Sequence, residues 1–490
     1  MGTQFKTGTK FNDVITKEII KTWNNENVIL NGATGSGKTY LIENNLYEYC
    51  EDNLKSILYL CNRTALFEQV LLEVKEEGLH NIDVMLYQTL QSKILKGEIV
   101  PHYDFIALDE FHYVLSDSIF NIYTDLTYDW IMEQTKSVKI FMSGTAQNIF
   151  NKLKLDGFVK EEYEYIIPYD YSYVKECKIY KEKFEVMNII NNILTTTDDK
   201  IIYFANSTDF AIEVYNQFKD DAHFRCSTES KNDEARELND VDCINGYNTD
   251  LITFNKRLLI TTKALDNGID IRDRDVKHII CDVFDLESAQ QCLGRKRKID
   301  DEDTCTFYIR NYSKKSIGNF KGGLNKNLNP VQMFIDNREE FDNTYGQDRK
   351  WHNNFIYFDG DKRQYNKLAH WKMICHSSDI ETMELISYKE LFLGRLGDTM
   401  TNIIDLEELE EMQLKDKLAM YLDSILDQRL DKEKQLELID RINVRVDGKQ
   451  QTSYGKLNIG LQMLELPYII ISKRVKENGK LNTVWIVNKL

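Results

Sequence analysis

The chain has 490 residues, 42% of them hydrophobic, and a formal net charge of −17. This length is typical of about three domains of ~100–200 residues each, and the acidic balance excludes a protein that coats nucleic acid by bulk attraction, although it leaves room for a local basic channel. The nine cysteines form no C-x-x-C pair and no apolar run approaches the ~18 residues of a membrane span, so we expect a cytoplasmic protein with neither a cysteine-based metal site nor a membrane partner.

Strands and helices are predicted to alternate from residue 28 to about 165. Short apolar runs predict strands at 28–30, 56–60, 83–86, 105–108 and 139–142. Amphipathic segments between them, such as 40–49 and 65–77, predict helices. The alternation predicts a parallel sheet covered by helices.

The most specific motif follows the first predicted strand. Gly32 to Thr39 fits G-x-x-x-x-G-K-[ST], the phosphate-binding P-loop. Glycines let backbone N–H groups turn around phosphates, Lys38 reaches the β- and γ-phosphates, and the Thr39 hydroxyl ligates Mg²⁺. The predicted nucleotide-binding residues are Gly32, Thr34, Gly35, Ser36, Gly37, Lys38 and Thr39. No adenine-reading glutamine motif precedes them, so we expect ATP with Mg²⁺ and leave other NTPs open.

A second motif, Asp109-Glu110-Phe111-His112, closes the predicted strand at 105–108. A P-loop NTPase needs an aspartate at such a strand end to hold Mg²⁺, and an acid beside it to orient the attacking water. We assign Asp109 the first role and Glu110 the second. A plain acidic turn is the alternative for this motif taken alone.

A tyrosine-rich stretch at 161–173 interrupts the alternation. Its tyrosines predict a β-rich linker, with base stacking as the alternative; they stand at 163, 165, 169, 171 and 173. The alternation resumes over 175–320 without a second P-loop. The sequence therefore predicts two similar α/β domains with one P-loop between them.

The character changes after Pro330, where a mainly helical, charge-laced region begins. The acidic segment 405–412 predicts a solvated helix face. A helix at 454–464 and strands at 468–473 and 483–487 predict a winged-helix-like ending. Cations cluster on this hairpin, where they either contact phosphates or keep an edge strand soluble: Lys473, Arg474, Lys476 and Lys480.

The ordered motifs resemble those of superfamily-2 helicases of the DExH (DEAD/DEAH-like) type. Residues 109–112 fit D-E-x-H, and further segments stand in the family's order at 57–66, 86–89, 143–146, 201–207, 261–271 and 291–298. The resemblance covers about residues 28–310. It implies two RecA-like parallel-sheet lobes in tandem, at 1–165 and 175–320, and an accessory region at 330–490 ending in a winged-helix-like element.

The resemblance also implies a role for each matching residue. Nucleic-acid contacts fall to Arg63, Gln88, Thr89 and Thr262. Coupling of hydrolysis to strand movement falls to His112, Ser143 and Thr145. Gly268 and Asp270 would face the nucleotide. The catalytic set is Lys38, Asp109, Glu110, Gln291, Arg295 and Arg297.

The sixth motif departs from the family pattern Q-x-x-G-R-x-x-R. Gln291, Gly294 and Arg295 match it, but Lys298 replaces the final arginine and Arg297 stands one place earlier. A planar guanidinium stabilises charge on a transferring phosphoryl group better than an ammonium does. Whether Arg297 or Lys298 takes the role of the motif's final arginine stays open. For the basic run 295–298 taken alone, a basic surface patch is the alternative.

The predicted function is an ATP-dependent nucleic-acid helicase or translocase, with DNA preferred over RNA. The alternative is an NTP-gated nucleic-acid-binding protein, or a remodeller that displaces proteins, without strand separation. A P-loop kinase or switch is a third hypothesis, and its hydrolysis would be indifferent to added nucleic acid. Protein partners, translocation polarity and oligomeric state do not follow from the sequence.

Overall fold

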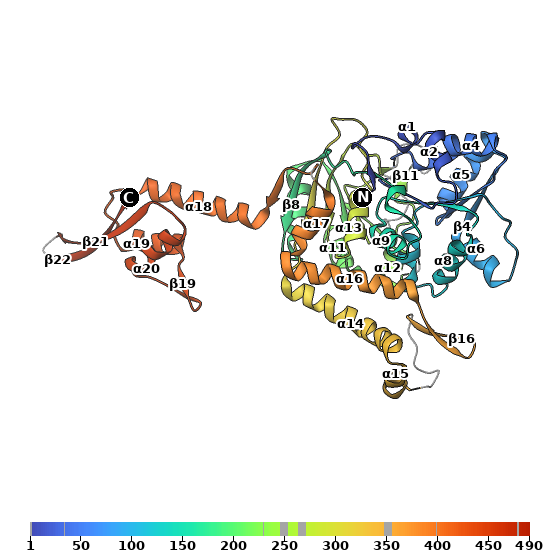
Figure 1. Cartoon of the computed structure of the whole chain (residues 1–490). Coiled ribbons are helices and arrows are strands. Elements are labelled where there is room, and N and C mark those ends of the chain that lie inside the picture. Colours follow the sequence, from blue (N-terminus) through green and yellow to red (C-terminus); the bar gives the residue numbers. More distant parts are fainter. Residues whose placement is uncertain are drawn as a thin grey trace. The chain divides into compact units, whose positions relative to one another are not determined.

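The computed structural model describes residues 2–33, 35–228, 230–245, 253–262, 271–346, 355–397, 399–477 and 480–490. The chain divides into two compact units, Met1–Ile403 and Ile404–Leu490 (Figure 1). The first unit contains two large sheets. Among the described residues, no helix combines the length and the hydropathy that a membrane crossing requires.

The first sheet has seven strands in the order β1-β7-β2-β6-β5-β3-β4, and its paired strands are parallel. The strands are β1 (Thr3–Gln4), β2 (Val28–Gly32), β3 (Ile57–Cys61), β4 (Ile82–Leu86), β5 (Phe105–Leu108), β6 (Val138–Ser143) and β7 (Glu164–Ile167). Every residue of β3, β5 and β6 is buried, because helices cover both faces of a parallel sheet.

Nine short helices accompany this sheet in the described residues: α1 (Phe11–Val14), α2 (Lys17–Thr22), α3 (Lys38–Leu41), α4 (Tyr47–Asp52), α5 (Thr64–Glu76), α6 (Tyr87–Leu95), α7 (Tyr113–Ser116), α8 (Thr124–Glu133) and α9 (Gln147–Leu155). A π-helical turn, η1 (Ile42–Leu46), joins α3 to α4, and a short turn, η2 (Asp117–Ile119), follows α7. The P-loop therefore opens one nearly continuous helical segment from 38 to 52.

The second sheet also has seven strands, in the order β10-β13-β9-β14-β15-β8-β18. They are β8 (Val174–Tyr180), β9 (Lys200–Phe204), β10 (Ala222–Arg225), β13 (Leu258–Thr261), β14 (Val276–Cys281), β15 (Cys305–Arg310) and β18 (Ile403–Asp405). Its helices include α10 (Glu185–Thr196), α11 (Thr208–Phe218), α12 (Asp233–Leu238) and α13 (Leu286–Leu293), and a small ladder pairs β11 (Ile244–Asn245) with β12 (Thr253–Phe254).

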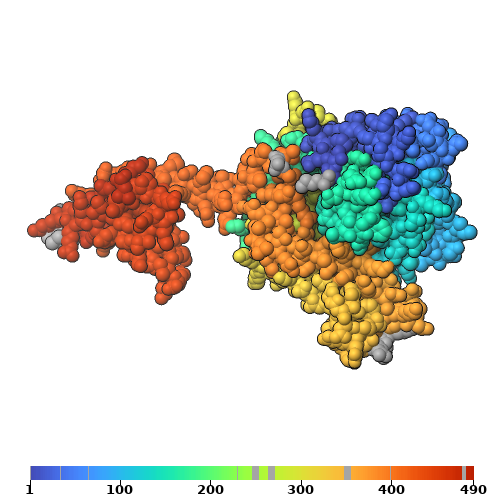
Figure 2. Space-filling model, in the orientation of Figure 1, coloured from blue at the N-terminus to red at the C-terminus, as the bar shows by residue number. Residues whose placement is uncertain are grey.

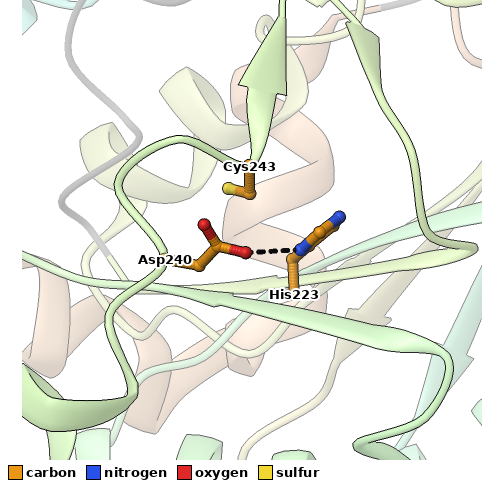
Figure 3. Close-up of side chains that lie close together, drawn as sticks. All are labelled: His223, Asp240 and Cys243. Atoms are coloured by element: carbon orange, nitrogen blue, oxygen red, sulfur yellow. Dashed lines mark hydrogen bonds and ion pairs between the residues drawn. The ribbon is translucent and has the colours of Figure 1, made fainter.

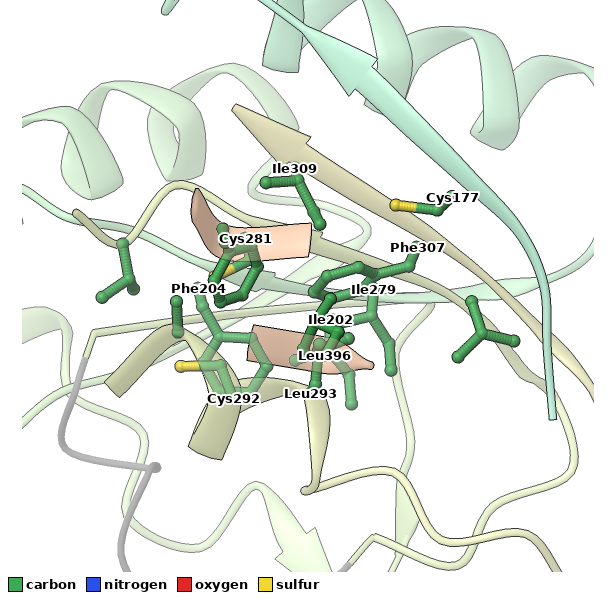
Figure 4. Packing of buried hydrophobic residues seen from close by; sticks show 14 of the residues in the cluster. Cys177, Ile202, Phe204, Ile279, Cys281, Cys292, Leu293, Phe307, Ile309 and Leu396 are labelled. Atoms are coloured by element: carbon green, nitrogen blue, oxygen red, sulfur yellow. The ribbon is translucent and has the colours of Figure 1, made fainter. Parts of the chain in front are cut away.

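Alternate residues of the second sheet form one face of its core. Ile202, Ile279 and Phe307 lie side by side on neighbouring strands, and Cys177, Cys281 and Cys292 fill the space around them as small buried thiols (Figure 4). The predicted fold class, α/β with two RecA-like parallel-sheet lobes in tandem, is confirmed.

The helices that follow the second lobe in the sequence pack against both lobes. They are α14 (Lys314–Asp336), α15 (Arg338–Tyr345), α16 (Lys367–Ile386) and α17 (Tyr388–Leu396), with a hairpin of β16 (Ile356–Asp359) and β17 (Lys362–Tyr365) between α15 and α16. α14 and α16 pack against each other, and α14, α15 and β16 form a projection from the first unit (Figures 1 and 2). Pro330 is buried inside α14, so the change of composition at this residue ends no helix.

Helix α16 contacts the two lobes at its opposite ends. At its start, the backbone N–H groups of Lys367 and Leu368 donate to the Asp125 carboxylate of α8 at 2.6 and 3.0 Å. Leu368 belongs to the core of the first lobe. Towards the other end, Ile380 and Met383 are buried in the core of the second lobe. The helix therefore holds both lobes at once.

The second unit contains α18 (Leu406–Ser424), α19 (Lys432–Ile442), α20 (Tyr454–Met463), the short pair β19 (Arg445–Val446) and β20 (Lys449–Gln450), and the hairpin β21 (Tyr468–Glu477) and β22 (Lys480–Lys489). The helix and hairpin predicted at the end of the chain are thus present, and the winged-helix assignment stays a prediction. Lys473, Arg474 and Lys476 are exposed on β21. Their exposure is consistent both with phosphate contact and with keeping an edge strand soluble.

The predicted domain boundaries, at residues 165, 175, 320 and 330, also stay predictions.

Candidate nucleotide site

The glycine-rich loop follows β2 and leads directly into α3. Gly35 and Gly37 have φ angles of 82° and 81°, a region that side chains other than glycine rarely adopt, so the turn depends on these residue types. Lys38 begins α3, and its Nζ donates to the backbone oxygens of Gly32 and Ala33 at 2.7 and 3.0 Å. The ammonium therefore lies within the loop. Thr34 lies outside the described residues.

The segment that contains α1 packs over the P-loop. The backbone N–H of Phe11 donates to the Ser36 oxygen at 2.8 Å. A Cβ added at Gly32 would meet the Phe11 ring at 2.8 Å, and one added at Gly37 would collide with the Asn12 side chain. Gly32 is thus required for close packing, and Gly37 for the turn and for packing against Asn12. The sequence pattern did not indicate that this segment contacts the loop.

Asp109 follows β5 directly and is 5% exposed. The Tyr59 hydroxyl on β3 donates to Asp109 Oδ2 at 2.6 Å and lies 3.4 Å from Thr39 Oγ1. Burial and the charge of Glu110 raise the pKa of Asp109, and the charge of Lys38 opposes them. A hydroxyl and a carboxylate are oxygen ligands of the kind that Mg²⁺ takes, so the donor set formed by Thr39 and Asp109 fits this ion.

Glu110 combines an unusual backbone conformation with two polar neighbours. Its φ of 46° is in the left-handed region, which is sparsely populated by residues with a Cβ and recurs at functional sites. Glu110 Oε2 lies 3.1 Å from His112 Nδ1 and accepts a hydrogen bond from Ser143 Oγ at 3.3 Å. Burial alone would raise the pKa of Glu110, but the His112 hydrogen bond and nearby cations outweigh it and hold the pKa below its ordinary value. The carboxylate is therefore ionised at neutral pH.

The second lobe contacts the residues around Glu110 through α13 and the residues that follow it. Gln291 Nε2 donates to Thr145 Oγ1 at 2.6 Å, and Glu287 Oε1 accepts from the Asn148 backbone N–H at 3.0 Å. A cavity of about 20 Å³ lies at the junction, lined by residues that include Glu110, His112, Thr145, Gln291, Arg295 and Arg297. Such a volume holds about one water molecule, so a triphosphate needs the lobes to separate from this arrangement.

The four residues of the basic run at 295–298 have three different environments. Arg295 and Arg297 line the small cavity, and the charge of Arg295 lowers the pKa of Glu110. Lys296 is fully buried and paired with Asp303 at 2.5 Å, which identifies it as a structural residue. Lys298 pairs instead with Asp301, and its side chain is 41% exposed. Of the two candidates for the role of the sixth motif's final arginine, Arg297 is the one that lines the cavity.

Among known proteins, a family model matches part of the first lobe. Residues 24–153 match the family described as an AAA domain, a span that contains the P-loop and Asp109 to His112. No curated protein matches the chain. Among solved structures, S. cerevisiae Dbp5 bound to RNA and ADP BeF3 aligns at 14% identity with a TM-score of 0.42, covering 61% of this chain and 82% of that chain. A point variant of the same protein in the same bound state aligns at 15% identity with equal TM-score and coverage. Similarity at this level identifies neither an activity nor a partner.

The residues predicted to contact nucleic acid follow strands of both sheets. Arg63 precedes α5, Gln88 and Thr89 are exposed in the first turn of α6, and Thr262 follows β13. Each therefore lies just beyond the carboxyl end of a parallel strand, the edge where open α/β sheets bind ligands. Their contacts with nucleic acid stay a prediction. Gly268 and Asp270 lie outside the described residues.

Tyr59 and Tyr169 belong to the site although no motif pattern singled them out. Tyr169 lines the small cavity together with Glu110 and Arg295, and its ring stacks on Tyr171 with centroids 5.5 Å apart. A Cβ added at Gly144 would collide with the Tyr169 hydroxyl. Gly144 stands where the resembled family has alanine, and the tyrosine linker supplies the physical reason for this departure.

A histidine, an aspartate and a cysteine also meet at the edge of the second sheet: His223, Asp240 and Cys243 (Figure 3). His223 Nδ1 lies 2.7 Å from Asp240 Oδ2, and its Nε2 accepts from the Lys256 backbone N–H at 3.3 Å. Both ring nitrogens are therefore engaged within the protein. Burial raises the pKa of Cys243 to about 11, which keeps its thiol protonated. We therefore interpret this cluster as a structural one, whose hydrogen bonds stabilise the edge of the second sheet.

Proposed function

We propose that this chain is a nucleic-acid-dependent NTP hydrolase of the superfamily-2 helicase type, with ATP as its main substrate. The observation that carries the proposal is the meeting of Glu110, from the first lobe, with Arg295 and Arg297, from the second, around one cavity. An ionised acid and two guanidinium groups next to a P-loop are the groups that phosphoryl transfer to water requires. A DNA strand is the preferred partner, and the helix and hairpin at the end of the chain support that preference.

The proposed chemistry assigns one task to each group. Lys38 exchanges the carbonyls of Gly32 and Ala33 for the β- and γ-phosphates. Glu110 orients the attacking water and accepts its proton. Arg295 and Arg297 stabilise the negative charge that spreads over the transferred phosphoryl group. Mg²⁺, held through Thr39 and Asp109, neutralises charge on the phosphate oxygens when it is bound.

Coupling to strand movement is proposed to use the hydrogen bonds that surround Glu110. His112 and Ser143 both contact its carboxylate, and Ser143 Oγ also accepts from the Thr145 backbone N–H at 3.3 Å. Thr145 in turn accepts from Gln291 of the other lobe. Loss of the γ-phosphate would therefore be transmitted from Glu110 to the contact between lobes, and opening and closing of the lobes would change the grip on a strand.

Two substitutions in the first lobe test this proposal. Hydrolysis of ATP is measured with and without single- and double-stranded DNA and RNA at a stated salt concentration. We expect stimulation by a single strand in the unaltered protein and its loss in both Lys38→Ala and Glu110→Gln. Glu110→Gln should still bind ATP, because the P-loop is intact. Stimulated hydrolysis that survives both substitutions contradicts the proposal. An unwinding assay on the same sample separates a helicase from a clamp or remodeller that hydrolyses ATP without parting strands.

A further inference from the structure

A second and much larger cavity lies where the second lobe meets α14 and α16. Its volume is about 650 Å³, against about 20 Å³ for the cavity at Glu110, and it falls within the range of ~300–1,000 Å³ that is typical of ligand pockets. Asn206 and Ser207 line it from the segment after β9, Phe320 and Asn327 from α14, and Lys372 from α16. None of these residues belongs to the nucleotide site.

The lining is positively charged although the chain as a whole is acidic. Lys183, Arg310 and Lys372 line the cavity, and Asp282 is the single carboxylate among the described residues around it. Asp282 accepts a hydrogen bond from Arg310 at 3.0 Å. Three basic side chains and one carboxylate thus line the cavity. In a protein with a net charge of −17, a cationic cavity selects for an anionic occupant.

One wall of the cavity is aromatic and rigid. Phe320 stacks on Phe284 with ring centroids 3.7 Å apart and an angle of 12°, and Tyr312 meets the edge of Phe320 at 5.7 Å. The three rings form one packed group, so Phe320 is held in place without an occupant. Asn319 and Asn327 line the cavity beside it. An aromatic face flanked by amides and cations suits a nucleotide, with its flat base, hydrogen-bonding edge and phosphate.

The cavity lies next to a predicted nucleic-acid contact. β9 and β13 are neighbours in the second sheet, and the Ala205 backbone N–H donates to the Thr261 oxygen at 2.8 Å. Asn206 and Ser207 therefore begin beside Thr262, at the carboxyl ends of the two strands. Ile119 of the first lobe also lines the cavity. The cavity and Thr262 therefore lie at the same edge of the second sheet.

We propose that this cavity holds one nucleotide of a bound single strand, with its base against Phe320 and its phosphate near Lys183 and Lys372. The inference rests on the proposed function and extends it, because it gives α14 and α16 a direct part in binding the strand. These helices then form a wall of the strand path in addition to the two lobes.

The test uses the full chain and a fluorescently labelled single-stranded oligonucleotide, with binding followed by anisotropy. Phe320→Leu keeps an apolar side chain against Phe284 but removes the stacking face, and we expect about tenfold weaker binding, within the range for loss of base–aromatic stacking. In the double variant Lys183→Gln, Lys372→Gln, we expect the slope of log Kd against log salt to fall by about 1.4, or about 0.7 for each lost contact. Lys326→Gln is the control, since Lys326 is exposed on α14 and does not line the cavity.

Hydrolysis of ATP without nucleic acid should be equal in all these variants. If the unaltered protein binds the strand and both the Phe320 and the double lysine variants bind it equally well, the cavity is not on the strand path, and the proposed function stands without this inference. If Phe320→Leu lowers the thermal unfolding midpoint, the lysine variant alone decides. If the unaltered protein binds no strand in any nucleotide state, the inference and the proposed function both fail.

Discussion

Tyr59 is positioned to hold one oxygen of Asp109 in a fixed direction. Its hydroxyl donates to Asp109 Oδ2, whereas the Tyr87 hydroxyl donates to the Asp109 backbone oxygen at 3.0 Å. Both tyrosines are fully buried. Tyr59→Phe should therefore raise the Mg²⁺ concentration for half-maximal hydrolysis about tenfold, as loss of an outer hydrogen bond to a metal ligand does. Tyr87→Phe is the matched control and should leave that concentration within about twofold. Equal Mg²⁺ dependence in the two variants would remove Tyr59 from the site.

Gly144 tests the contact between the tyrosine linker and the P-loop side of the site. Gly144→Ala places a methyl group against the Tyr169 hydroxyl and 3.0 Å from Gly32 O and Ala33 Cα. We expect a lower rate of stimulated hydrolysis and a partial recovery when Tyr169→Phe is added, because the second change removes only the hydroxyl. The rates of the two single variants and the double variant form a cycle that measures the coupling. Additive effects would show that the hydroxyl is not the obstacle.

At the residue scale, the sequence predicted the residues whose chemistry depends on local spacing. The P-loop glycines lie at or just after the end of β2, and Asp109 and Glu110 follow β5, as the motifs indicate; β6 lies between these two strands in the sheet. Tyr59 and Tyr169 were not predicted as site residues, since each reaches the site through packing between segments distant in the chain. Gly144 stands where the resembled family has alanine, and no sequence pattern explained this difference. Its reason became visible with the position of the Tyr169 hydroxyl.

At the element scale, the start of α16 depends on a single carboxylate of the first lobe. Asp125 accepts from two backbone N–H groups that have no partner within their own helix. We expect Asp125→Ala to lower the free energy of unfolding by about 1–2 kcal/mol, the usual cost of losing a helix cap or leaving buried donors unpaired. Asp129→Ala is the control, because Asp129 pairs with the exposed side chain of Lys367; it should cost less than about 1 kcal/mol. Urea unfolding measures both, and equal losses would contradict this role.

The π-helical turn η1 places Glu43 against α5, where Glu73 and Glu77 face it. Burial, followed by the charges of Glu73, Glu77 and Asp109, raises the pKa of Glu43 to about 8. The folded protein therefore binds a proton here that the unfolded chain releases, and stability should fall as the pH rises from the ordinary glutamate pKa towards 8. Glu43→Gln cannot ionise and should weaken this decline. Unfolding midpoints from about pH 5 to about pH 9 provide the measurement, and parallel pH profiles for the two proteins would contradict the expectation.

At the scale of the whole molecule, the sequence predicted two parallel sheets because their buried strands are near-continuous apolar runs separated by amphipathic helices. It did not predict that α16 would join both lobes. The residues that do so, Leu368 at one end and Met383 at the other, are ordinary apolar residues whose partners lie far away in the chain. Pro330 was taken as the point where composition changes, yet it is packed within α14. A helix tied to both lobes will limit how far they separate, which bears directly on how a triphosphate enters.

The most direct test of the account is the rate of ATP hydrolysis in the presence of a single strand, compared between Arg295→Ala and Lys298→Ala. Arg295 lines the cavity that contains Glu110, whereas Lys298 pairs with Asp301. The account predicts a loss of about a thousandfold for Arg295→Ala, the size expected when a guanidinium is removed from the transferring phosphoryl group, with ATP binding retained. Lys298→Ala should stay within a few-fold of the unaltered rate. If Arg295→Ala hydrolyses ATP as fast as the unaltered protein, the second lobe takes no part in the chemistry and the motor account is wrong.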